Sequence, residues 1–397
     1  MTPVSVTGVT PSPPPLARPL TAARAVGPDA GARSAEIEAA RTLPADLVAE
    51  LAAAGLFRMW VPAEVGGAEA SVADGLAAIE ELAYHDGATS WCVMIAATTG
   101  LLGAFLPADH AVRIFGDPAS VAGGFAAPMG RGRAVAGGLR VSGRWQWGSG
   151  TQHCTWIGGG CLVVDDDGRP TTRVDGLAAP FAFFDRTDVE LLDTWYVAGL
   201  EGTGSTDYAV SDAFVPEGRW VQLGGPPRVD GPLYRFSFYG MLALGVASVA
   251  LGRGRRAVDE LVALAGDKRP QGSSRPLAER APIQAEVAGA EATVRSARAL
   301  VDDVVGTTWA DVLAGRPLTD EHKRSLRLAA THATQASAEA TTRCYTAGGG
   351  AAVYASSPLQ RVFRDVHVAT QHAMVAPRTF ELAGRLRLGL DTDTRQL

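Results

Sequence analysis

The sequence has few cysteines, no excess of positive charge and no long uninterrupted apolar run. Its four cysteines form no CxxC pair, which indicates reduced thiols in a cytoplasmic protein rather than a disulfide framework. The formal net charge of −6 argues against a nucleic-acid-binding protein, because neutralising phosphates needs a basic surface. No apolar run reaches the roughly 20 residues that a membrane helix needs. We therefore expect a globular cytoplasmic protein without a nucleic-acid or membrane partner.

Common catalytic signatures are also missing. The sequence contains no GxxxxGK[ST], GxSxG or HExxH motif, which excludes the commonest nucleotide hydrolases, serine esterases and zinc peptidases. The seven histidines are scattered, so no metal site is expected. Gly252 to Ala257 matches the dinucleotide motif GxGxxA. Because it lies inside a helical pattern and outside any βαβ unit, it is predicted to be structural.

The composition, with 47% hydrophobic and 20% charged residues, is that of a folded protein, and hydrophobic periodicity divides the chain into four parts. Residues 1–30 are predicted to be a disordered tail because their Pro-rich start favours an extended chain. Residues 31–118 have helical spacing, and residues 119–228 alternate short β-branched or aromatic runs with turn residues. Residues 229–397 return to helical spacing. The predicted fold is α+β and mostly α: an N-terminal helical domain, a central antiparallel β domain and a C-terminal four-helix bundle.

The last two parts define individual elements. The predicted strands are Leu139–Trp147, Trp156–Val164, Leu177–Phe184 and Tyr208–Val215. The predicted bundle helices are Phe236–Leu264, Arg275–Leu313, Leu318–Ala347 and Pro358 to about Leu388.

The last predicted helix carries an unusual polar stripe. Steps of four, three and four residues place Arg361, Asp365, Val368 and His372 on one face. A structural ion pair with a buried core histidine would explain this stripe taken alone. An acid–imidazole pair for proton transfer is the alternative.

Two further segments have residues typical of a ligand site. Trp145 and Trp147 alternate along a strand that ends at Ser149 between two glycines, a combination that suits a flat heteroaromatic ring. Thr203, Gly204 and Ser205 lie in a loop that can present hydroxyl and backbone donors. The structural alternatives are an aromatic core strand and a solvated turn.

The ordered segments resemble the acyl-CoA dehydrogenase superfamily over about residues 43–390. The matching segments are Glu64–Gly67, Asp86–Trp91, the strand ending at Gly150, the Asp193–Ser205 loop, Phe214–Pro216 and Phe363–Asp365. The resemblance implies a homotetramer that binds flavin between sheet and bundle, with Trp147 and Ser149 against the isoalloxazine ring. It further implies that Thr203, Gly204 and Ser205 line the cleft. The remaining flavin contacts that it implies are Gly348, Gly349 and Arg269, the last reaching a neighbouring subunit's flavin.

Departures from the dehydrogenase pattern concern its catalytic base. Ala373 stands where a dehydrogenase carries its glutamate, and residues 231–252, the family's alternative location, contain no Asp or Glu. Without a carboxylate, ordinary β-oxidation chemistry has no group to remove the α-proton. Met374, Val375 and Pro377 also replace residues that help to hold FAD.

His372, with the residues around Arg364, is similar to the flavin-dependent monooxygenase branch of the superfamily. Those two-component enzymes take reduced FMN or FAD from a separate NAD(P)H:flavin reductase and form a C4a-hydroperoxyflavin with O₂. The resemblance implies that His372 stabilises this hydroperoxide or activates the substrate, with Asp365 as its orienting neighbour. Trp91, Thr99 and Met374 would line the pocket of a small aromatic or apolar substrate. Two alternatives remain: a flavin dehydrogenase or desaturase with a non-Glu base, and a catalytically silent flavin-binding paralogue.

Overall fold

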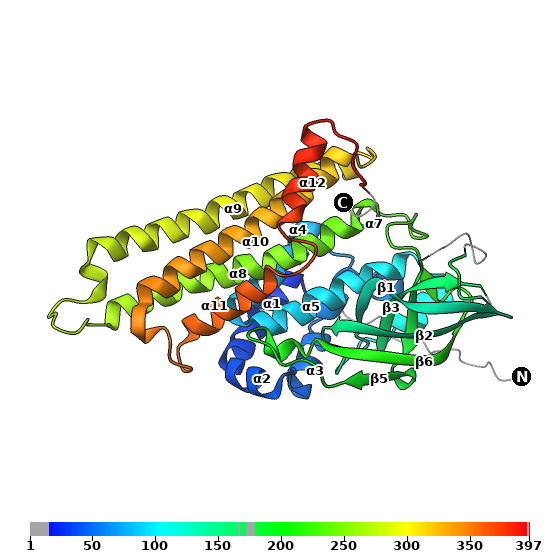
Figure 1. Cartoon of the computed structure of the whole chain (residues 1–397), viewed down its shortest axis with the longest axis horizontal. Coiled ribbons are helices and arrows are strands. Elements are labelled where there is room, and N and C mark those ends of the chain that lie inside the picture. Colours follow the sequence, from blue (N-terminus) through cyan, green and yellow to red (C-terminus); the bar gives the residue numbers. More distant parts are fainter. Residues whose placement is uncertain (1–15, 166, 172–178, 395–396) are drawn as a thin grey trace, which may run out of the picture.

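The computed structural model of the chain describes residues 16–165, 167–171, 179–394 and 397. A bundle of long helices forms one end of the molecule and a sheet forms the other, with the N-terminal helices packed between them (Figure 1). The predicted order of helices, sheet and helices is confirmed, as is the mostly helical α+β class.

In the described part of the chain, six α-helices precede the sheet. They are α1 (Pro19–Ala32), α2 (Ser34–Ala40), α3 (Ala45–Ala53), α4 (Val72–His85), α5 (Gly87–Gly100) and α6 (Ala108–Phe115). The prediction of a disordered tail up to residue 30 is wrong from Pro19 onward. Proline suits the first turn of a helix, and the small residues Ala22, Ala23 and Ala30 are buried together with Val26. Residues 1–15 lie outside the described part of the chain.

Helix α5 is the central helix of this N-terminal group. Asp86 caps it by accepting from the Thr89 backbone N–H at 2.7 Å. Every residue of the helix except Ile95 is buried, as its nearly continuous apolar sequence predicts. The window Gly87–Ala104 is long and apolar enough to cross a membrane, but 94% of it is buried inside the protein, as in a core helix.

Within the described ranges, seven strands form one sheet in the order β5-β6-β2-β1-β3-β4-β7. The strands are β1 (Ala122–Val135), β2 (Gly138–Gly148), β3 (Trp156–Val164), β4 (Phe181–Asp185), β5 (Val189–Leu192), β6 (Thr206–Pro216) and β7 (Trp220–Val221). The prediction of a purely antiparallel sheet is wrong at one pair. After the β1–β2 hairpin the chain returns to the start of β1, so β3 pairs with β1 in parallel. Of the predicted strand Leu177–Phe184, the first two residues lie outside the described ranges.

The bundle is built on three long helices, α8 (Phe238–Asp267), α9 (Ala281–Leu313) and α10 (Asp320–Gly348), preceded by the short α7 (Pro232–Arg235). The predicted fourth helix is interrupted: α11 (Pro358–Ala369) and α12 (Arg378–Arg387) flank a turn. The GxGxxA segment lies inside α8, where a side chain at Gly252 would meet backbone atoms of Glu80 and Tyr84. Its glycine therefore allows α4 and α8 to approach closely, which is a structural role.

Candidate active site

His372 lies in the turn between α11 and α12, where the bundle meets α5. Its Nδ1 accepts a hydrogen bond from the Met374 backbone N–H at 3.2 Å. Its ring packs against the Trp91 indole, edge to face, with centroids 5.6 Å apart. Because α11 ends at Ala369, His372 does not continue the helical stripe that contains Asp365, and that prediction is wrong.

The surroundings of His372 keep its ring neutral. Burial, together with the positive charge of Arg327, lowers the pKa of His372 to about 4. A neutral imidazole carries one proton, and Nδ1 already accepts from a backbone N–H, so the proton resides on Nε2. His372 therefore presents a hydrogen-bond donor near neutral pH.

Trp91 joins His372 to a line of three hydroxyl groups from the sheet. The Trp91 Nε1–H donates to Ser149 Oγ at 3.0 Å. Ser149 Oγ lies 2.6 Å from Ser205 Oγ, which lies 2.7 Å from Thr203 Oγ1. All four side chains are buried. The two segments that were predicted separately to bind a ligand are therefore in contact.

Trp147 has a different environment from Trp145, which contradicts the prediction that both line one aromatic wall. Trp145 is fully buried and stacks on Tyr208 with centroids 5.3 Å apart. The β2–β6 register shifts after Trp145, and Trp147 adopts a φ of 58°. Its indole is 56% exposed and packs edge to face on Phe125. A tryptophan in the left-handed region is strained, and such strain is common at ligand sites.

Asp365 is not bonded to His372. Its Oδ1 accepts from the Leu200 backbone N–H at 2.8 Å, and its Oδ2 lies 3.9 Å from Arg253 Nε. Burial raises the pKa of Asp365 to about 6, against the opposing effect of Arg253. The carboxylate thus holds the loop that carries the hydroxyl groups, and the expectation that it orients His372 directly is wrong.

The neighbouring residue of α11 fixes the same loop. Arg364 donates to the Ala198 carbonyl at 2.9 Å and to Glu201 Oε1 at 3.2 Å. Gly204 has a φ of 51°, and a side chain there would lie 2.8 Å from the Arg41 carbonyl oxygen. A glycine is therefore required where the loop turns toward Ser205.

Two of the predicted substrate residues, Trp91 and Met374, contact His372. The Met374 backbone binds both the His372 ring and, through its carbonyl, Arg327 Nε at 3.2 Å. Thr99 is two turns beyond Trp91 on the same face of α5, but its hydroxyl donates to the Ile95 carbonyl at 2.8 Å. Arg327 and Phe125 were not predicted, because their contacts join segments that are distant in the sequence.

Three predicted cofactor residues lie elsewhere. Arg269 is exposed in the connection after α8, and Gly348 accepts from Lys268 Nζ at 2.7 Å at the end of α10. Gly349 follows directly with a φ of 55°. This end of the bundle points away from the sheet (Figure 1). Within one chain these residues are not brought to Ser149.

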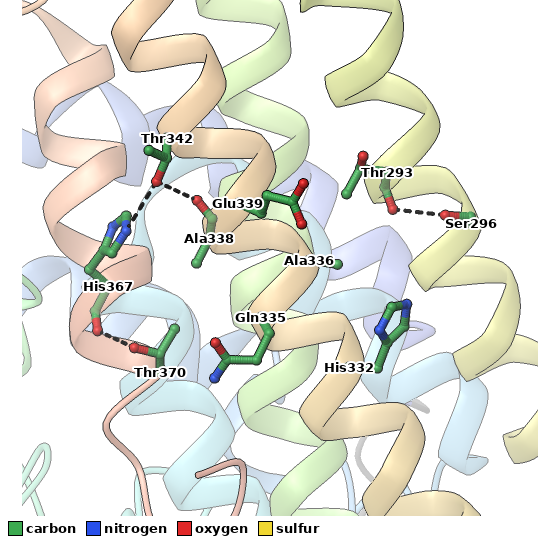
Figure 2. A pocket seen from close by; sticks show the side chains of 10 residues that line it. All are labelled: Thr293, Ser296, His332, Gln335, Ala336, Ala338, Glu339, Thr342, His367 and Thr370. Carbon is green, nitrogen blue, oxygen red and sulfur yellow. Dashed lines mark hydrogen bonds between the residues drawn. The ribbon is translucent and has the colours of Figure 1, made fainter. Parts of the chain in front are cut away.

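A hollow of about 510 Å³ lies on the bundle between α9, α10 and α11 (Figure 2). His367 points into it and its Nε2 lies 3.2 Å from Thr342 Oγ1. Its other lining residues are mostly small or polar, among them Gln335 and Glu339. In the described ranges no group of three or more His, Cys, Asp or Glu side chains could hold a metal ion.

Comparison with known proteins identifies relatives of this architecture. The family description "Acyl-CoA dehydrogenase, N-terminal domain" matches residues 21–107, and "Acyl-CoA dehydrogenase, C-terminal domain" matches residues 244–377. The chain is 32% identical to an indole-3-acetate monooxygenase of Pseudomonas putida, over 90% of each protein.

Solved structures agree with this relationship. A 3-HSA hydroxylase from Rhodococcus sp. RHA1 superposes with a TM-score of 0.88 at 27% identity, covering 96% of this chain and 99% of that one. XiaF from Streptomyces sp., solved with FADH2 and glycerol, superposes with a TM-score of 0.86 at 26% identity, covering 94% and 95%. The chain belongs to the acyl-CoA dehydrogenase superfamily and, within it, to the flavin-dependent monooxygenases.

Proposed function

We propose that this oxidoreductase binds reduced FMN or FAD at Trp147 and Ser149 and oxygenates a small, mostly apolar or aromatic molecule. Reduced flavin, when bound, supplies the electrons that activate O₂. The observation that carries the proposal is the contact of His372 with Trp91 and, through Trp91, with the hydroxyls of Ser149 and Ser205.

The residues present suit a flavin ring. An isoalloxazine has two flat faces and an edge of N–H and C=O groups. Trp147 offers an exposed indole beside Phe125, and aromatic faces of this kind stack on flat rings. Ser149 offers a buried hydroxyl two residues away. Thr203, Gly204 and Ser205 complete the hydroxyl-rich side of the site.

His372 serves as a hydrogen-bond donor in this proposal. The Met374 N–H occupies Nδ1, so Nε2–H is the group left to contact a reacting oxygen atom. A role as general base is disfavoured, because Nε2 already carries the ring proton and adding a second proton to the ring would oppose its low pKa. His372 therefore stabilises developing negative charge on oxygen rather than deprotonating a substrate.

The substrate class follows from the groups near His372. Trp91 and Met374 supply apolar surface, and the hydroxyl of Thr99 is already bonded to its own helix, so only its methyl group is available. Such a lining suits an aromatic ring. The indole-3-acetate monooxygenase of Pseudomonas putida is named for a substrate of this class.

A dehydrogenase or desaturase is the second candidate, and the position of Ala373 argues against it. Ala373 is exposed in the turn after α11, and the carboxylate of Asp365 is occupied by Leu200 and Arg253. No carboxylate hydrogen-bonds to His372 within the described ranges. The silent paralogue, by contrast, is distinguished only by an activity measurement.

We propose a homotetramer in the cytoplasm, fed by a separate NAD(P)H:flavin reductase. Arg269, Gly348 and Gly349 lie at the end of the bundle that points away from the sheet (Figure 1), so they would contact a flavin bound by a neighbouring chain. The polar face around His367 in Figure 2 is then available for contact between chains. Light scattering would give a mass near four chains, and a monomer would remove this part of the proposal.

The activity test supplies reduced FMN or FAD from a purified reductase in labelled O₂, with a panel of indoles and phenols that includes indole-3-acetate. We expect a product that carries one labelled oxygen atom. Flavin oxidation without product from any panel member would support the silent paralogue. Desaturation of an acyl-CoA would support the dehydrogenase.

A further inference from the structure

In the line of hydroxyl groups that ends at Ser149, each hydrogen bond can be donated in one direction only. A hydroxyl group has one proton to donate and two lone pairs that accept. Thr203 Oγ1 lies 2.8 Å from the Leu200 carbonyl oxygen, which can only accept. The proton of Thr203 is therefore directed to Leu200.

The remaining donors follow from this one. Thr203 has no second proton, so its 2.7 Å contact with Ser205 is a hydrogen bond only if Ser205 donates. Ser205 then has no proton for its 2.6 Å contact with Ser149, so Ser149 donates to Ser205. The Trp91 indole N–H is a donor only and gives its proton to Ser149. Any reversal would place two lone pairs against each other at hydrogen-bond distance.

We infer that Ser149 meets a ligand only as an acceptor, and that Thr203 and Ser205 thereby make the site select reduced over oxidised flavin. This inference rests on the proposed flavin site. Trp91 takes one lone pair of Ser149 Oγ, and Ser205 takes its proton. One lone pair remains for a ligand.

Two neighbouring atoms on one edge of the isoalloxazine ring, O4 and N5, would respond differently to an acceptor at Ser149. The O4 carbonyl accepts hydrogen bonds in both redox states, so it is unsuited to Ser149. The N5 atom carries a hydrogen in reduced flavin and only a lone pair in oxidised flavin. Ser149 would therefore accept a hydrogen bond from N5–H of the reduced form and would face a lone pair of the oxidised form, which would leave both acceptors unsatisfied at a buried hydroxyl.

The Leu200 end of the line is held by α11. The Leu200 carbonyl also accepts from Trp195 Nε1 at 3.3 Å, and the Leu200 N–H donates to Asp365 Oδ1. The acceptor that sets the direction is thus fixed in place by a side chain that no ligand needs to touch. This arrangement makes Thr203 a positioning residue for redox-state selection, acting through Ser205 and Ser149.

The test compares dissociation constants for reduced and oxidised flavin, measured anaerobically and aerobically by ultrafiltration with FMN and FAD. The wild-type protein should bind the reduced form more tightly. Thr203→Val removes the acceptor of the Ser205 proton, and Ser205→Ala removes the acceptor of the Ser149 proton. In either variant Ser149 can then donate to a ligand, so each should lower the preference for reduced flavin about three- to tenfold. Thr203→Ser keeps the hydroxyl group and should therefore retain the preference for reduced flavin.

Ser90→Ala is the matched control, because Ser90 is a buried serine beside Trp91 whose hydroxyl donates to the Ile79 carbonyl. Circular dichroism confirms that each variant is folded. Equal binding of both redox states by the wild type, or an unchanged preference in Thr203→Val and Ser205→Ala, overturns the inference while leaving the flavin site intact. Failure of the wild type to bind either form overturns the proposed function itself.

Discussion

At His372, one backbone N–H determines which ring nitrogen carries the proton. The Met374 N–H occupies Nδ1, and the pKa of about 4 keeps the ring uncharged at neutral pH. A histidine in an active site is often assigned as a base because of its ordinary pKa near 6.5. Here burial and Arg327 remove that titration from the neutral range, so the neutral ring has an Nε2–H that can donate a hydrogen bond.

The effect of replacing His372 on the product yield should therefore depend on whether the new side chain can donate a hydrogen bond. His372→Ala is expected to lower the yield of product per reduced flavin oxidised by about tenfold or more, because uncompensated charge on oxygen favours wasteful release of hydrogen peroxide. His372→Asn, whose amide can donate, should retain more of the yield. Chromatography of product and flavin measures the ratio. Wild-type yield in His372→Ala would remove His372 from the mechanism.

The same assignment fixes the pH profile of the yield. With a pKa of about 4, His372 stays neutral from pH 6 to pH 8, so we expect a flat profile over this range. A step near pH 6.5 that disappears in His372→Asn would contradict the donor role.

Sequence reasoning found most residues of this cluster but not their arrangement. Ser149, Thr203 and Ser205 were predicted from small and hydroxyl residues next to glycines. The direction of their hydrogen bonds depends on distances between segments about 50 residues apart. The exposure of Trp147 depends on a shift in strand register that leaves no mark in the residue pattern.

At the scale of elements, α11 holds the 193–205 loop and ends at Ala369, before His372. Arg364 and Asp365 bind three residues of that loop, Ala198, Leu200 and Glu201. The Arg-Asp pair of the sequence is thus a support for the hydroxyl groups.

Two substitutions at Asp365 separate support from chemistry. Asp365→Asn keeps an oxygen that accepts from Leu200 and should preserve flavin affinity within a few fold. Asp365→Ala removes the acceptor of the buried Leu200 N–H and the carboxylate that lies 3.9 Å from the buried Arg253, and is expected to cost about 2–4 kcal/mol of stability. Flavin affinity should fall with it. Urea unfolding and flavin titration measure the two effects. Loss of activity in Asp365→Asn with full flavin affinity would instead indicate direct catalysis.

The break between α11 and α12 explains the main error of the sequence analysis. Gln371, Ala373, Met374 and Ala376 are good helix formers, so local propensity at these positions favours continuation of the helix. Pro377 disfavours the helical conformation at the residue before it, so the sequence did contain one signal of a helix end. The other causes are tertiary: Met374 binds the His372 ring and Arg327, and these contacts replace helical hydrogen bonds.

At the scale of the whole molecule, hydrophobic periodicity predicts the order of helices and sheet because each element covers a continuous apolar face. The parallel β1–β3 pair was missed, since pairing direction is set by where the chain returns and not by local pattern. Helix α1 was missed because its proline-rich start resembles a disordered segment, although its alanines fit against α4.

Stability should depend on pH through a histidine outside the catalytic cluster. Burial lowers the pKa of His153 to about 4, and both its ring nitrogens are buried without a hydrogen-bond partner. The unfolded chain binds this proton below about pH 6.5, so stability is lost as pH falls from about 6.5 to about 4.

His153→Phe should remove that loss, up to about 3 kcal/mol. Asp365 titrates over part of the same range with the opposite sign, because its raised pKa gives stability that is lost as pH rises through about 6. Comparing urea unfolding of the variant and the wild type cancels this effect. The difference should grow steadily from pH 7 to pH 4.5, relative to its value at pH 8. A constant difference would contradict the buried neutral state of His153.

Assembly should affect flavin affinity through the distal end of the bundle. Arg269→Ala is expected to weaken FAD binding about fivefold or more, by removing a cation from a neighbouring chain's flavin. Arg275→Ala, a nearby exposed arginine paired with Glu279, is the matched control. Equal FAD affinity in both variants would exclude Arg269 from the cofactor site.

The most direct measurement of the central claim is rapid mixing of the protein and reduced FMN or FAD with oxygenated buffer, followed by absorbance. We predict a transient spectrum that is neither reduced nor oxidised flavin, with a shorter lifetime in His372→Ala. Oxidation of the flavin in one step at the rate of free flavin, without a transient, would contradict a monooxygenase built on His372.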